Sequence, residues 1–199
     1  FDSGMLYYSP QIWCSDDTDA VERLEIQEGT ALIYPLSTMG AHVSVCPNHS
    51  VGRVTPFETR GHVALAGTFG YELDITKLPE EEHKMIKEQT EMYHKYNDLV
   101  REGDYYRIAS FSENGHYDCY MEVAKDKSEA LVTYVQVRGV PNNKSKKFKL
   151  QGLDPKAVYQ LEGTEENYSG EILMKGGYLF KDFWGDAVSR LYHFVKKNK

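Results

Sequence analysis

The sequence has no run of 18 apolar residues, and its first residues, FDSGMLYY, lack the basic segment and apolar run of a secretion signal. Positive charge is also scarce: 23 lysines and arginines stand against 30 aspartates and glutamates, which gives a net charge of −7. Nucleic-acid binding normally requires a basic face, so a neutral partner is favoured over nucleic acid. No contact with a membrane is expected.

Cysteine is scarce as well. The three cysteines, Cys14, Cys46 and Cys119, are odd in number and widely spaced, which is typical of reduced thiols in a cytoplasmic protein. They are too scattered for a zinc motif, so no metal site is expected. The chain also lacks an initial methionine and opens inside what reads as structured sequence; we expect that an upstream portion is missing.

The first half of the chain alternates strand-like and helical patterns. Strands are predicted near Met5–Tyr8, Ala31–Tyr34 and Val63–Gly67, the last within the continuous apolar run HVALAG. This alternation is typical of a parallel sheet covered by helices. A closed barrel of eight such units needs roughly 250 residues, so about three units can form only part of one.

Two helices are predicted in this half. Asp17 or Thr18 can cap the first, whose apolar residues follow from Ala20, and Gly29 supplies a stop. The second, Pro79–Arg101, has acidic residues in its first turn and apolar residues at three- and four-residue spacing.

Beyond the long helix the pattern changes to short strands separated by turn residues, which predicts an antiparallel β-sandwich. We place the boundary so that residues 1–105 hold the strand–helix units and residues 106–199 the sandwich. The predicted strands lie in YMEVA, EALVTYVQV, KKFKLQGL, AVYQLEG, GEILMKGGY and RLYHFVKK.

The most unusual stretch is WCSDDTDA, from Trp13 to Ala20, which has three aspartates within four residues. Asp17 and Asp19 stand at a helix start, where carboxylates cap the backbone and complement the helix dipole. From the residues alone, Asp16 is more readily a loop aspartate than a catalytic one, and Trp13 fits a core position as well as a sugar platform. Elsewhere, His42 and His62 are expected to be buried structural residues, and Arg53 and Arg60 to fix loops.

Long motifs in the same order carry a family resemblance. FDSGMLYYSPQIWCSDDTDAVERLEIQEGT and YPLSTMGAHVSVCPNHSVGRVTPFETRGHVALAGTFGYELD resemble the C-terminal part of bacterial α-galactosidases of glycoside hydrolase family thirty-six. GLDPKAVYQLEG and YSGEILMKGGY resemble their C-terminal β-domain. The resemblance implies an α/β plus all-β chain: the C-terminal portion of a catalytic (β/α)8 barrel followed by an antiparallel β-sandwich domain.

The same resemblance implies retaining hydrolysis of terminal α-linked galactose, without a cofactor, from oligosaccharides such as melibiose or raffinose. Such enzymes use two carboxyl groups about 5 Å apart, one as nucleophile and one as general acid/base. The family's general acid/base is the first aspartate of a Trp-x-Ser-Asp stretch, which matches Asp16. Trp13 is a candidate for stacking on galactose because aromatic rings commonly stack on sugars.

The family's nucleophile motif, Lys-Trp-Asp, does not occur in the sequence. We therefore expect the isolated chain to be inactive. Separately, the family resemblance leads us to expect that the intact enzyme is a homo-oligomer. The alternative is a non-catalytic piece whose β-domain only supports a barrel.

Overall fold

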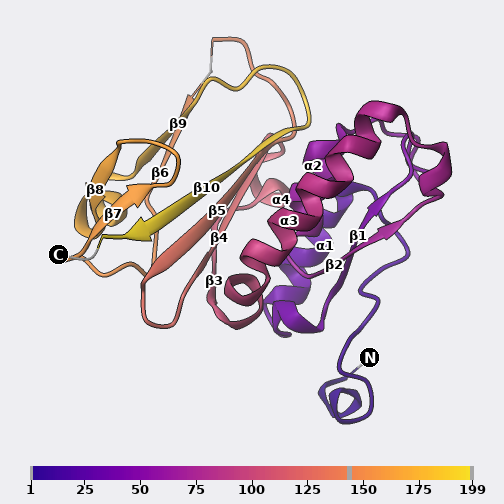
Figure 1. The fold of residues 1–199 in the computed structure, drawn as a ribbon, viewed down its shortest axis with the longest axis horizontal. Coiled ribbons are helices and arrows are strands. Elements are labelled where there is room, and N and C mark those ends of the chain that lie inside the picture. The colour runs from indigo at the N-terminus through magenta and orange to yellow at the C-terminus, as the bar shows by residue number, and fades with distance from the viewer. Residues whose placement is uncertain (1, 143–144, 198–199) are drawn as a thin grey trace. The chain divides into compact units, whose positions relative to one another are not determined.

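A computed structural model describes residues 2–142 and 145–197 and is drawn as a ribbon in Figure 1. The chain divides into two compact units, Phe1–Arg101 and Glu102–Lys199. The sequence pattern places this boundary slightly later, between residues 105 and 106. Within the described residues, no helix is both long enough and apolar enough to cross a membrane.

The first unit is built on a short parallel sheet. Strands β1 (Gly40–Ser44) and β2 (Thr68–Glu72) pair in parallel, and Ile12 joins β1 through a single parallel bridge to Met39. The unit also contains three α-helices and three 3-10 helices: α1 (Ala20–Ala31), α2 (Phe57–Ala64), α3 (Glu80–Glu102), η1 (Ser3–Tyr7), η2 (Leu36–Thr38) and η3 (Ile75–Lys77).

The apolar core of this unit lies between β1 and its helices. Ala41 and Val43 of β1 pack with Phe57 and Ala64 of α2, and Met85 and Ile86 of α3 are among the residues that pack against this cluster. The predicted long helix is confirmed as α3, and its apolar residues Met85 and Ile86 pack against this core. Strand and helix therefore alternate along the chain, as the pattern indicated.

All three strands predicted in the first unit are misplaced. Met5–Tyr8 falls in η1 and the residue after it, where Tyr7 and Tyr8 are 86% and 79% exposed, so no neighbouring strand covers them. Ala31–Tyr34 contains the end of α1 and the turn that follows. Helix α1 continues through Gly29, so the predicted stop there is wrong. Of the residues predicted to cap this helix, Asp19 is the N-cap, which confirms its predicted role, and Asp17 and Thr18 are not.

The third predicted strand, Val63–Gly67, covers the end of α2 and the residues before β2. Phe57, Val63 and Ala64 are all buried on α2, so the apolar run serves a helix face and β2 begins only at Thr68. An apolar run of this length fits a buried helix segment as well as a strand. Strand β1 (Gly40–Ser44) lies between the second and third predicted strands, where the sequence pattern predicts none.

The second unit is an antiparallel β-domain. Six strands form a sheet in the order β3-β4-β5-β10-β7-β8, and β6 pairs with β9 in a second sheet; Figure 1 shows β5 and β10 side by side. The elements are β3 (Asp104–Ala109), α4 (Phe111–Asn114), β4 (Tyr117–Val123), β5 (Glu129–Gln136), β6 (Ser145–Phe148), β7 (Val158–Leu161), β8 (Asn167–Ser169), β9 (Tyr178–Lys181) and β10 (Val188–Lys196).

Aromatic side chains fill the space between the two sheets. Tyr134 of β5 contacts Phe148 of β6 and Phe180 of β9, with ring centroids 5.9 and 5.6 Å apart. Tyr134 and Phe180 belong to a single buried cluster that includes residues of β4, β7 and β10, and Phe148 packs against this cluster. The predicted β-sandwich is thus confirmed.

One predicted strand in this unit is wrong. GEILMKGGY contains a turn of π-helix, η4 (Ile172–Gly176), before β9 starts at Tyr178. The two elements meet at Gly177, whose φ of +84° and whose closeness to the Phe148 carbonyl leave no room for a Cβ atom. Strands β3 and β8 were not predicted.

Candidate functional site

The loop from Trp13 to Asp19 connects the Ile12 bridge to helix α1. It opens with a tight turn in which the Ser15 amide donates to the Trp13 carbonyl at 2.6 Å and Cys14 has a φ of +61°. Positive φ is strained for a residue with a side chain, and such strain is concentrated at functional sites. The thiol of Cys14 lies 3.2 Å from Thr30 Oγ1 of α1 and anchors the turn to that helix.

The three aspartates of this loop have different surroundings. Asp19 is 2% exposed, and its Oδ2 accepts hydrogen bonds from the amides of Val21 and Glu22 at 3.0 and 3.1 Å, so it is the helix N-cap. Asp17 Oδ1 accepts from the Asp19 amide at 3.0 Å. Asp16 is exposed, and its carboxyl has no hydrogen bond or ion pair within the described ranges.

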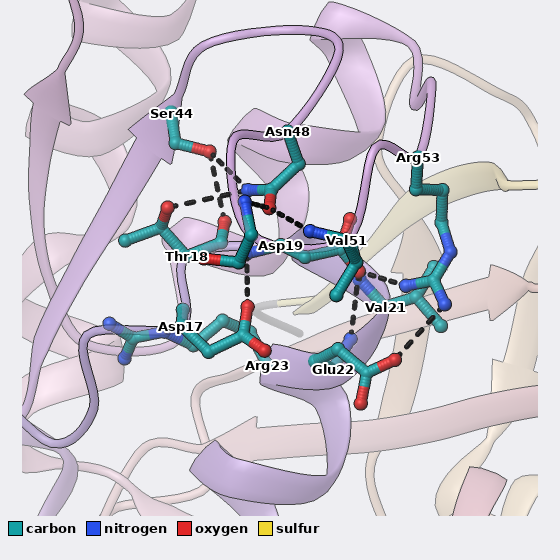
Figure 2. Close-up of polar contacts among 11 residues, drawn as sticks. Asp17, Thr18, Asp19, Val21, Glu22, Arg23, Ser44, Asn48, Val51 and Arg53 are labelled. Atoms are coloured by element: carbon teal, nitrogen blue, oxygen red, sulfur yellow. Dashed lines mark hydrogen bonds and ion pairs between the residues drawn. The ribbon is translucent and has the colours of Figure 1, made fainter.

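A second loop, residues 45–53, is tied to the start of α1 (Figure 2). Arg53 forms ion pairs with Asp19 and with Glu22, the latter at 3.0 Å. Asn48 donates to Thr18 Oγ1 at 3.4 Å, while its Oδ1 accepts the amides of Ser50 and Val51. The expectation that Arg53 fixes a loop is confirmed.

Arg60 also fixes backbone, at a different place. It is 4% exposed and donates to the carbonyls of Thr55 and Ser44 at 3.0 and 2.7 Å, besides pairing with Glu82 at 2.7 Å. Arg23, under the Asp16 loop, is a second buried arginine of this kind and donates to three backbone carbonyls. The sequence analysis did not identify Arg23, because backbone acceptors have no sequence signature.

Trp13 is 47% exposed and lies against His42 of β1, with ring centroids 4.2 Å apart and an interplanar angle of 30°. Burial, together with the charge of Arg23, lowers the pKa of His42, so the imidazole is neutral at pH 7. Its Nδ1 is buried and has no hydrogen-bond partner in the described part of the chain. One face of the indole is therefore covered by a neutral ring.

The described residues contain no group of three or more His, Cys, Asp or Glu side chains that could hold a metal ion. Cys14, Cys46 and Cys119 are free thiols. Within the Trp13–Asp19 loop, the exposed groups are the Asp16 carboxyl and the half-exposed Trp13 indole.

Two known family patterns match the chain. Residues 1–103 match the Melibiase family, and residues 117–194 match the glycosyl hydrolase family 36 C-terminal domain.

Curated relatives and solved structures agree with these matches. Alpha-galactosidase AgaA from Geobacillus stearothermophilus is 50% identical over 192 residues, which cover 96% of this chain and 26% of that protein. The bifunctional alpha-galactosidase/sucrose kinase AgaSK from Mediterraneibacter gnavus is 49% identical over 197 residues, covering 98% of this chain and 21% of its own length.

A crystal structure of a variant of AgaA with raffinose superposes with a TM-score of 0.95 at 47% identity, covering 99% of this chain and 27% of that one. The chain thus spans about a quarter of the length of the relatives it matches. Over this span its architecture is that of a barrel end followed by a β-domain, as expected from the sequence.

Proposed function

We propose, given that this chain belongs to glycoside hydrolase family 36, that it supplies the general acid/base of a retaining α-galactosidase. The observation that carries the proposal is the separation of roles within one loop. The carboxyls of Asp17 and Asp19 accept backbone hydrogen bonds, whereas that of Asp16 is exposed and unpaired within the described residues. Asp16 is thus the member of the trio that can exchange a proton with a substrate.

In the proposed mechanism, Asp16 donates its proton to the glycosidic oxygen while a second carboxylate attacks the anomeric carbon. Asp16 then takes a proton from the water that releases galactose. Because the Lys-Trp-Asp motif of the family's nucleophile does not occur in the sequence, we assign the second carboxylate to residues outside 1–199.

Trp13 is the proposed platform for the sugar. His42 covers one face of the indole, so a galactose ring would stack on the other face, with its C–H groups against the π-system. Structures of AgaA variants with raffinose and with stachyose support α-galactosides as the substrate class, with melibiose as a shorter member. No cofactor takes part in this mechanism.

The test is made in an enzyme of family length that carries residues 1–199. Asp16→Ala should slow turnover of raffinose strongly and of an activated aryl α-galactoside much less, because only the poor leaving group needs protonation. External azide should restore activity towards the aryl substrate. Equal loss on both substrates without azide rescue would refute the acid/base role.

Asp17→Ala is the matched control for this test. It removes the neighbouring carboxyl and its hydrogen bond to the Asp19 amide, but no proton donor. Its losses should be similar for both substrates, and azide should have no effect.

A second candidate role is structural support of a barrel without activity in residues 1–199 alone. It is favoured by the small sheet of the first unit, two strands and one bridge residue, which cannot enclose a substrate. We expect these residues alone to leave an activated aryl α-galactoside intact. Steady turnover that disappears in Asp16→Ala would show that the chain contains a complete site.

Two further proposals concern the setting of the enzyme. The three free cysteines support a reducing, cytoplasmic compartment. We also propose that the intact enzyme is a homo-oligomer, which light scattering of the family-length protein would test.

A further inference from the structure

Arg23 lies beneath the Asp16 loop and is 1% exposed. It stands four residues after the N-cap Asp19, and helical side chains lean towards the N-terminus of their helix. Its guanidinium therefore reaches back into the loop, where Figure 2 shows Arg23 beside Asp17.

Three donors of Arg23 bind three backbone carbonyls. Nη2 donates to the Ser15 carbonyl at 2.7 Å and Nε to the Asp17 carbonyl at 2.6 Å, on either side of Asp16. Nη1 donates to the Gly40 carbonyl of β1 at 3.1 Å. The planar fork thus joins the two residues that flank Asp16 to the sheet.

This arrangement is costly for the fold. A cation in the first turn of a helix opposes the helix dipole. Burial lowers the pKa of Arg23, even though the nearby carboxylates of Glu72, Asp17 and Asp16 oppose that shift. Arg23 has no ion-pair partner within 4.0 Å among the residues that the structure describes. A well-packed apolar residue often stabilises a fold as well as a buried charge does. We therefore relate the arginine to the hydrogen bonds that it donates to the carbonyls of the Asp16 loop.

We propose that Arg23 is the positioning residue for Asp16: by holding the carbonyls of Ser15 and Asp17 against β1, it fixes where the Asp16 carboxyl points. This inference rests on the proposed function of Asp16. Rigid support has a large effect on rate, because a displacement of about 1 Å can cost about 100-fold.

The test uses Arg23→Lys in an enzyme of family length that carries residues 1–199. Lysine keeps the positive charge, but its compact ammonium cannot replace a planar fork that joins three carbonyls. We expect kcat on raffinose to fall about 100-fold, kcat on an activated aryl α-galactoside to fall much less, and KM to change little on either substrate. This is the leaving-group dependence expected of misplaced acid catalysis.

Arg60→Lys is the matched control. Arg60 is also a buried arginine that donates to two backbone carbonyls, but these belong to Ser44 and Thr55 and not to the Asp16 loop. It should lower the melting temperature without leaving-group dependence. Equal losses on both substrates in Arg23→Lys, or the same dependence in Arg60→Lys, would overturn the inference.

A double-mutant cycle separates this inference from the proposed function. If Asp16→Ala alone shows no leaving-group dependence, the proposed function of Asp16 fails. If it does, Arg23→Lys should cause no further loss in the Asp16→Ala background, because Arg23 acts through Asp16; a further loss of the full size would refute positioning. Should Arg23→Lys not fold, Arg23→Met, which leaves no buried charge, takes its place in the same cycle with the same expected outcome.

Discussion

Glu122 of β4 should make the protein less stable as the pH rises towards neutrality. Its side chain is 1% exposed, and neither carboxyl oxygen has a hydrogen-bond partner within residues 2–142 and 145–197. Burial raises its pKa from 4.5 to about 8, so the folded protein keeps Glu122 protonated while the unfolded chain releases the proton from about pH 4.5. The stability associated with protonated Glu122 is therefore complete below pH 4.5 and is lost progressively as the pH approaches 8.

The size of this loss follows from the two pKa values. Each pKa unit corresponds to about 1.4 kcal/mol, and integration between pH 5 and pH 7.5 gives a loss of about 3 kcal/mol in the free energy of unfolding. Glu122→Gln replaces the carboxyl by an amide that does not titrate, so this part of the pH dependence should disappear. The variant should gain about 3 kcal/mol relative to the wild type between the two pH values.

Urea unfolding at several pH values, followed by near-ultraviolet circular dichroism of the tyrosine-rich second unit, measures this difference. Glu91→Gln, which changes an exposed glutamate in α3, is the control and should follow the wild-type curve. Parallel curves for the wild type and Glu122→Gln from pH 5 to pH 7.5 would refute the assignment of a buried, protonated carboxyl.

Three other outcomes are expected. Burial lowers the pKa of His62 from 6.5 to about 4, so the unfolded chain takes up the proton first and stability falls as the pH decreases through this range; His62→Gln should remove about 3 kcal/mol of that loss in acid unfolding curves. Gly170→Ala should lower the free energy of unfolding of the second unit, measured in urea, by about 2 kcal/mol or more, because a Cβ atom would overlap the Asp154 carbonyl. Gly29→Ala, which has open space around it, is the control and should stabilise α1. In an enzyme of family length, Trp13→Ala should raise KM for raffinose roughly fivefold, for the loss of about 1 kcal/mol of ring contact; an unchanged KM would exclude stacking on Trp13.

Local patterns account for what the sequence predicted correctly. Helix α3 was predicted because its apolar stripe and acidic first turn lie within one continuous segment. Strand β1 was not predicted, because Gly40–Ser44 is a strand through its pairing with β2, which lies more than 20 residues later in the sequence. The run HVALAG is apolar enough for either element. In the structure its first part belongs to α2, with Ala64 in the same buried cluster as Ala41 and Val43 of β1.

The candidate site shows the same limit. The capping role of Asp19 follows from its place before α1, but nothing local distinguishes Asp16 from an ordinary loop aspartate, so its assignment depended on the family resemblance. Arg23 was out of reach, since its three acceptors are carbonyls of Ser15, Asp17 and Gly40. Every residue type has the same backbone carbonyl, so no pattern of residue types reveals such a contact.

The contact between Trp13 and His42 has an optical consequence. A protonated imidazole quenches the fluorescence of an indole that it touches, and these rings lie 4.2 Å apart. Because the pKa of His42 is lowered, Trp13 should emit fully at neutral pH and dim only in acid. The chain has two tryptophans, and Trp184 lies in the other unit. Replacing Trp184 by phenylalanine in residues 1–199 therefore leaves Trp13 as the remaining tryptophan, and its emission reports the protonation of His42 without an added dye.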